Sequence, residues 1–121
     1  MRSCVLITVI FATLPVPAHA GDTCNPGRAV SEVTAPPKGA TTLSGPFSVE
    51  ELEKANMSVN RKSGQTVPFG YSNMKWLDMK AAMQVGDQIY FVVHRDGIFR
   101  VEYYALVRNG CIIRTLLGLI T

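Results

Sequence analysis

This chain has few of the residues that usually build metal and catalytic sites. It contains three cysteines, two histidines and one tryptophan in 121 residues, and only 17% of its residues are charged. Zinc sites combine several His, Cys and carboxylate ligands, so we expect no metal and no cofactor. After residue 20 the only histidine is His94, beside a predicted turn, and no Gly-x-Ser-x-Gly motif accompanies it. We therefore assign no catalytic residue, and the sequence favours a non-enzymatic role.

Strong net charge and long hydrophobic runs are also missing. Twelve Lys and Arg oppose nine Asp and Glu, a net charge of +3. The basic residues are scattered, which argues against a nucleic-acid partner. No apolar run after residue 20 approaches the roughly 20 residues that cross a bilayer, so no transmembrane segment is expected. A length of 121 residues with 47% apolar content fits one small domain with a core.

The first 20 residues have the layout of a secretory signal peptide. Arg2 precedes an eleven-residue, mostly apolar stretch at 4–14, two prolines break that stretch, and Ala18-His19-Ala20 supplies the small residues that a signal peptidase reads. We expect cleavage after Ala20 and an exported protein, periplasmic or secreted.

Cleavage would leave Cys24 and Cys111 as the remaining cysteines. An even pair in an exported domain is typical of one disulfide. The bond would tie a Pro/Gly-rich arm at 21–47, where we expect no more regular structure than a short edge strand, to the last predicted strand. Two free buried thiols or an intermolecular bridge are the alternatives.

Residues 48–121 carry the patterns of an α+β core. Ser48 and Glu51 match a capping box before a helix at 49–55. A weaker pattern predicts a hairpin around the turn at 62–65. A second helix is predicted at 74–85, and its helical spacing places these residues toward the core: Met74, Leu77, Ala81 and Val85. The apolar stripe is widened by Trp76, Met79, Ala82 and Met83.

The last third of the chain predicts a three-stranded antiparallel meander. Asp96-Gly97 and Asn109-Gly110 separate β-rich runs at 88–94, 98–107 and 111–117. We expect this meander to pack against one or two short helices in a small single α+β domain that includes the arm and one disulfide. The residues expected on its core face are Phe99, Val101, Tyr103, Ala105 and Val107.

The opposite face of the meander is the predicted partner-binding surface. It carries Arg100, Glu102, Tyr104 and Arg114, and Arg and Tyr are favoured at protein interfaces. A cross-strand charge ladder without a partner is the alternative. The apolar run at 116–120 leaves open whether the last strand edge is buried or pairs with another chain.

The small, exported, single-disulfide profile resembles in type the periplasmic inhibitors and immunity proteins that neutralise cell-wall-degrading toxins, although no motif carries the resemblance. The sequence predicts a small exported binding protein that contacts another envelope or secreted protein stoichiometrically. Its oligomeric state is left open. A cell-wall or envelope hydrolase using carboxylates and a structural envelope subunit are the alternatives.

Overall fold

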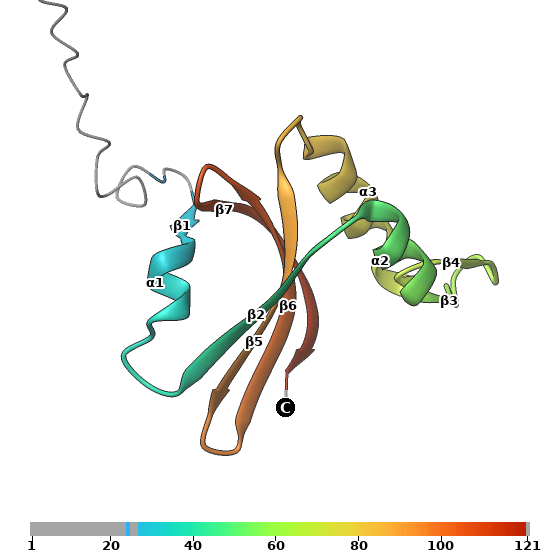
Figure 1. The fold of residues 1–121 in the computed structure, drawn as a ribbon. Coiled ribbons are helices and arrows are strands. Elements are labelled where there is room, and N and C mark those ends of the chain that lie inside the picture. Colours follow the sequence, from blue (N-terminus) through green and yellow to red (C-terminus); the bar gives the residue numbers. More distant parts are fainter. Residues whose placement is uncertain (1–23, 25–26, 121) are drawn as a thin grey trace, which may run out of the picture.

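A five-stranded antiparallel sheet forms the centre of the molecule, with the strand order β1-β7-β6-β5-β2 (Figure 1). The computed structural model describes residue 24 and residues 27–120. The strands are β1 (Arg28–Ala29), β2 (Ala40–Phe47), β5 (Gln88–Asp96), β6 (Phe99–Arg108) and β7 (Cys111–Ile120). The predicted signal peptide at 1–20 lies outside the described residues.

The predicted meander is present as β5, β6 and β7, but it is only part of the sheet. Asn109 and Gly110 have φ angles of 53° and 76°, the left-handed pair that Asn-Gly supplies in a two-residue hairpin turn. The arm is more regular than predicted, because it contributes the eight-residue strand β2, which pairs with β5. Its Thr, Ser, Gly and Pro content concealed a strand that depends on that pairing.

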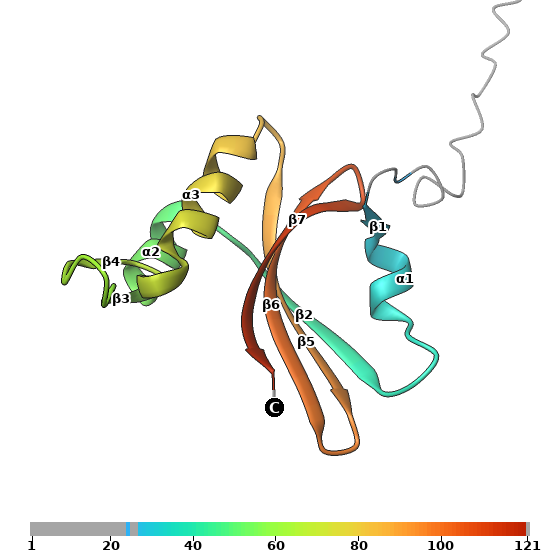
Figure 2. The ribbon, with the colours of Figure 1, turned by 180° about the vertical axis from the view of Figure 1, so that it is seen from behind.

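The helices lie on both sides of the sheet. Figure 2 shows α1 (Val30–Thr34) on one side and α2 (Val49–Ala55) with α3 (Asn73–Ala82) on the other. Between α2 and α3 the chain forms the small hairpin of β3 (Met57–Val59) and β4 (Thr66–Pro68), followed by the 3₁₀ turn η2 (Gly70–Ser72). The predicted capping box is confirmed: Ser48 Oγ accepts the Glu51 N–H at 3.1 Å, and Glu51 Oε1 accepts the Ser48 N–H at 3.0 Å.

Each face of the sheet has its own apolar cluster. The cluster beneath α2 and α3 comprises Leu52, Trp76, Met79, Ile89, Leu106 and Leu116. The cluster beneath α1 comprises Val33, Val92, Ala105, Val107 and Ile112. The sheet is therefore a middle layer, covered on each face over part of its length.

The predicted faces of β6 were right only in part, because the face expected to point outward is also covered. The larger helices cover the face of Tyr104 and Leu106, which the alternation placed outward. Phe99, expected in the core, is 60% exposed, whereas Ala105 and Val107 are buried beneath α1. Because β6 is buried on both faces near its end, its residues do not alternate between a polar, exposed face and an apolar, buried face there. The assignment of faces from the sequence depends on that alternation.

The predicted centre of the apolar stripe of α3 was wrong, whereas its predicted margin at Trp76 and Met79 forms the core. Met74 and Leu77 are exposed, as are Ala81 and Val85 beyond them, while Trp76 and Met79 are fully buried. Polar contacts fix this rotation of the helix, because Trp76 Nε1 and Lys80 Nζ each donate to Glu53 Oε2 at 2.8 Å. That carboxylate belongs to α2, so it joins the two helices.

The predicted disulfide is confirmed. Cys24 and Cys111 are bonded, with Cα atoms 5.5 Å apart and a sequence separation of 87 residues. The bond ties the segment before β1 to the first residue of β7. None of the helices in the described part of the chain is long and apolar enough to cross a membrane.

Candidate functional site

The outer edge of β7 is largely unpaired. β1 pairs only with Cys111 and Ile112, so within the described residues the stretch 113–120 borders β6 on one side and no strand on the other. A strand of this length extends about 27 Å. Unpaired N–H and C=O groups along such an edge are a template for a strand from another chain.

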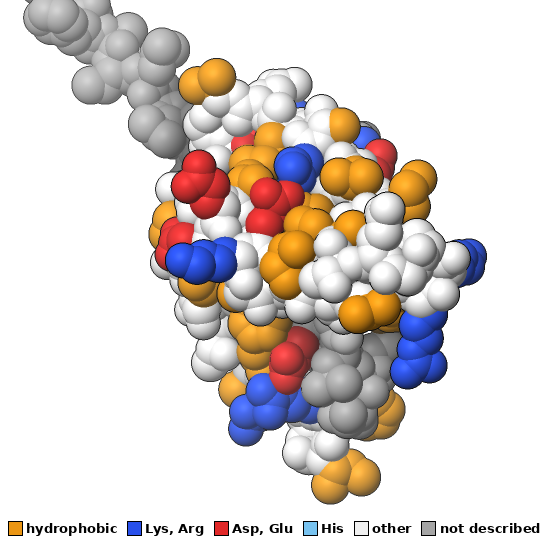
Figure 3. Space-filling view, turned by 90° about the vertical axis from the view of Figure 1, so that its right-hand side faces the viewer, with side chains coloured by type: hydrophobic (Ala, Val, Ile, Leu, Met, Phe, Trp, Pro, Cys, Tyr) orange, Lys and Arg blue, Asp and Glu red, His pale blue; other side chains and the backbone are white. Residues whose placement is uncertain are grey.

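An open groove of about 680 Å³, here called the hairpin groove, lies beside this edge. One wall comes from the β3–β4 hairpin and η2, where Met57, Val59 and Tyr71 are 49%, 55% and 86% exposed. The other wall includes Leu116 and Leu117 of β7. Figure 3 views the side of the molecule that carries the hairpin and shows hydrophobic side chains exposed there among polar ones.

A second cavity of about 370 Å³, here called the α1 hollow, opens on the other face of β7. Its lining includes Arg28, Val33, Tyr103 and Arg114. Leu117 lines both cavities. Because successive side chains of a strand point to opposite faces, a strand added to β7 would direct alternate side chains toward the hairpin groove and the α1 hollow.

The opposite edge of the sheet is less suited to pairing. There β2 contains Pro46, which has no backbone N–H to donate, and its register with β5 shifts between Ser44 and Phe47. Proline, lysine and irregular pairing are devices that protect sheet edges. From 113 to 118, β7 has no proline or lysine, and Arg114 is its only charged residue.

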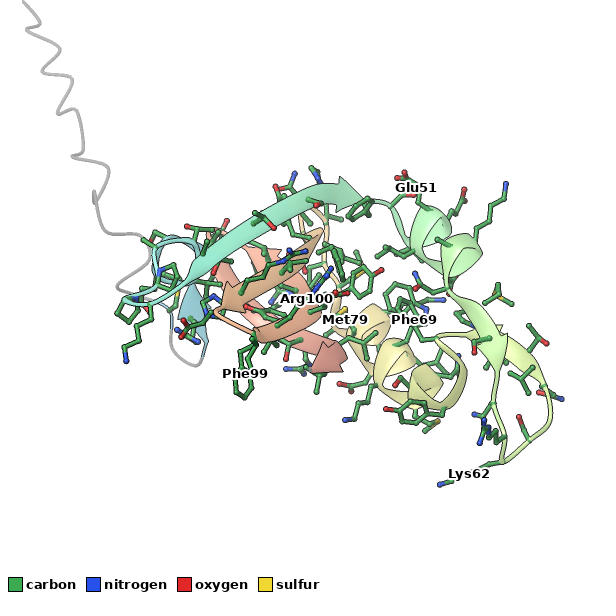
Figure 4. The ribbon with its side chains drawn as sticks, turned by 90° about the horizontal axis from the view of Figure 1, so that it is seen from below. Glu51, Lys62, Phe69, Met79, Phe99 and Arg100 are labelled. Carbon is green, nitrogen blue, oxygen red and sulfur yellow. A yellow bond between two sulfur atoms is a disulfide. The ribbon has the colours of Figure 1, made fainter. Side chains whose placement is uncertain are left out.

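The structure places Tyr104, one of the four predicted partner-binding residues, at the floor of the hairpin groove. Its ring packs edge-to-face on Phe69 (labelled in Figure 4), with the ring centroids 5.4 Å apart, and lies 4.8 Å from the Phe91 ring. Its hydroxyl accepts a hydrogen bond from Asn56 Nδ2 at 3.4 Å. Tyr104 therefore supports the groove from below.

The other three predicted residues are ion-paired. Arg100 Nε lies 2.5 Å from Glu102 Oε2, on the same face of β6 as Tyr104. Arg114 Nε lies 3.5 Å from Asp78 Oδ2, and the two side chains are 50% and 71% exposed. The structure thus brings Tyr104 and Arg114 to the β7 edge, and it places Arg100 and Glu102 as a mutual pair outside both cavities.

The contribution of the β3–β4 hairpin was missed by sequence reasoning. The hairpin itself was predicted weakly, but nothing in its short strands indicated that Met57 and Val59 would stay exposed and face β7 across a groove. Exposure of apolar residues in a short hairpin depends on where the hairpin docks, and that is set by distant parts of the chain.

Among the described residues, three carboxyl groups have a displaced pKa, and each holds a structural contact. Hydrogen bonds from Arg108, at 2.9 and 2.7 Å, lower the pKa of Asp87. Hydrogen bonds from Lys80 and then Trp76 lower the pKa of Glu53, and the Ser48 backbone N–H lowers that of Glu51. A general acid for glycoside hydrolysis needs the opposite shift, so these carboxyl groups do not support a hydrolase.

His94 is partly buried. Its Nδ1 lies 2.9 Å from Thr41 Oγ1, on the neighbouring strand β2. Among the described residues, no group of three or more His, Cys, Asp and Glu side chains is arranged to hold a metal ion. His94 therefore has a local structural partner.

The free edge, the hairpin groove and the α1 hollow form one continuous candidate site centred on Leu117. It offers backbone hydrogen-bonding groups flanked by two apolar cavities, which is an arrangement for binding an extended chain. Comparison with protein-family models, curated proteins and solved structures found no match to this chain.

Proposed function

We propose that this chain is an exported binding protein that contacts a protein partner stoichiometrically, and that the partner adds a strand to β7. The observation that carries the proposal is the unpaired edge at 113–118 between two cavities. In strand addition, main-chain hydrogen bonds supply affinity and side-chain pockets supply specificity. Export is proposed from the layout of residues 1–20, and the Cys24–Cys111 bond is compatible with an oxidising compartment.

The side chains around the edge have the composition of a protein interface. The hairpin groove contains Tyr71 and Arg61, and the α1 hollow contains Tyr103, Arg28 and Arg114. Tyr and Arg are enriched where proteins bind one another, because each offers a large apolar surface together with hydrogen-bond donors. Both cavities thus combine an apolar lining with a few polar groups.

The test is capture of the partner by the oxidised protein of residues 21–121 from its own cell envelope, with Leu117→Lys as the site variant. Leu117 is 49% exposed, so lysine is tolerated sterically while it places a charge at the centre of the edge. Phe99→Lys is the matched control, because Phe99 is 60% exposed and lies away from the β3–β4 hairpin (Figure 4).

We expect one stoichiometric partner to be captured by the unmodified protein and by Phe99→Lys, and to be lost with Leu117→Lys. A partner that Leu117→Lys retains at full level would remove the β7 edge as the site. Circular dichroism of both variants confirms that they are folded before capture is compared.

A structural subunit that assembles through the same edge is the second candidate, because an unpaired β7 is also available to a second copy. Light scattering across a range of protein concentrations separates the two. Dimers or larger assemblies that disappear with Leu117→Lys would favour the subunit, whereas a monomer at all concentrations would exclude it.

A further inference from the structure

We infer that the strand added to β7 is an acidic, extended segment of a partner protein, with apolar side chains directed to both cavities and carboxylates that meet Arg28, Arg61 and Arg114. This inference rests on the proposed function and specifies the chemistry of the partner.

The charge around the site has one sign. Arg61 lines the hairpin groove, while Arg28 and Arg114 line the α1 hollow, and among the described residues neither lining contains Asp or Glu. Acidic groups lie outside the two linings: Glu32 shares a third pocket with Arg28, and Asp78 forms an ion pair with Arg114 that is 3.5 Å long and exposed on both sides. Exposed pairs of this kind are weak, so Arg114 can exchange Asp78 for a carboxylate of the partner.

The expected apolar side chains of the ligand follow from the two cavities, which lie on opposite faces of β7. On one face, Met57, Phe69 and Leu116 form an apolar wall in the hairpin groove. On the other face, Val33 and Leu117 do the same in the α1 hollow. A bound strand therefore meets apolar surface on both of its faces, and carboxylates suit the positions that reach the arginines at the rims.

The same charges disfavour a second copy as the occupant. Pairing of β7 with β7 would bring two sets of the same arginines to one interface, and like charges brought close together repel each other. An acidic segment would instead be attracted during approach, which raises the association rate at low ionic strength.

The test is selection of random octapeptides, displayed on phage, against the oxidised protein of residues 21–121. Enriched sequences are then synthesised and titrated by fluorescence polarisation. We expect an excess of Asp and Glu, apolar residues at neighbouring positions that point to opposite faces, and binding that weakens about tenfold in 0.5 M NaCl, where surface charges are largely screened. The double variant Arg61→Glu, Arg114→Glu should weaken peptide binding by at least the same factor of about ten.

The matched control is Lys54→Glu with Lys75→Glu, which changes the net charge equally at two exposed positions outside both cavities. Peptides that are weakened by Leu117→Asn, which removes the apolar side chain without adding a charge, but are indifferent to salt and to the arginine variant would overturn the acidic ligand and leave strand addition intact. If no selected peptide is weakened by Leu117→Asn, the proposed function fails as well. Self-association lost with Leu117→Lys would make a second copy the occupant and overturn the inference.

Discussion

Removal of the Cys24–Cys111 bond should cost a large part of the free energy of unfolding. The bond joins residues 87 positions apart, and the chain-entropy relation for a loop of that length gives about 4.6 kcal/mol at 25 °C. Domains of this size have about 5–15 kcal/mol in total. The Cys24→Ser, Cys111→Ser double variant should therefore unfold at a much lower denaturant concentration than the oxidised protein.

The loss should also be uneven across the fold. β1 pairs with β7 through two residues only, and the next contact is the Val30 N–H on Gly110 O at 2.9 Å. Without the bond, we expect β1 and α1 to separate from the sheet below the global transition, because only this short pairing and the packing of Ala29 and Val33 then hold them. Hydrogen exchange of the Val30 amide should then be fast, while amides of β5 and β6 stay protected.

The assay is urea denaturation of the oxidised protein, the reduced protein and the double variant, followed by fluorescence of Trp76. The free energy of unfolding of the oxidised protein should also fall less steeply with urea concentration, because its cross-linked unfolded state exposes less surface. A difference of less than about 1 kcal/mol between oxidised and reduced protein would refute the chain-entropy reasoning.

Three further predictions concern the core, a buried carboxylate and a helix cap. Leu106→Ala should lower the free energy of unfolding by about 2–5 kcal/mol in denaturation experiments, because Leu106 is fully buried among large side chains. The pKa of Asp87 is lowered by Arg108, so its contribution to stability is present above the usual aspartate pKa of about 3.9 and is lost as the pH falls through the lower folded value. Asp87→Asn should accordingly melt below the unmodified protein at neutral pH, with a gap that narrows on acidification. Ser48→Ala should cost about 1 kcal/mol, measured by thermal unfolding, since it removes the cap of α2.

Local chemistry made several elements predictable from the sequence. Asn109-Gly110 favours a turn in which both residues have positive φ, whatever surrounds it. Ser48 and Glu51 satisfy each other's backbone groups within one helical turn. The disulfide followed from the number of cysteines that would remain after the predicted signal cleavage. Each of these features depends on a few residues that are close in the chain or unique in it.

Features that depend on packing from distant segments were not predictable. One face of β6 was wrongly placed outward, because α1 covers one face and α3 the other. The pairing of β6 with β7 is irregular at two places, between Glu102 and Tyr103 and between Leu106 and Val107. Each irregularity changes which side chains of β7 share a face with those of β6. Ile112 therefore pairs with Val107 and lies on the same face. The candidate site combines the hairpin, α1 and β7, so it exists only once these separate segments have docked.

The position of β1 also has a consequence for the order of folding. The β5–β6 and β6–β7 hairpins close through short turns, whereas Arg28 pairs with Ile112 across most of the chain. Local contacts form faster than contacts that close long loops, so the meander should form early and β1 should dock last. Cys24 and Cys111 then come within bonding distance only when the sheet is nearly complete. The disulfide would therefore form only after the rest of the sheet has folded. The rate of its formation during refolding would measure how fast β1 docks.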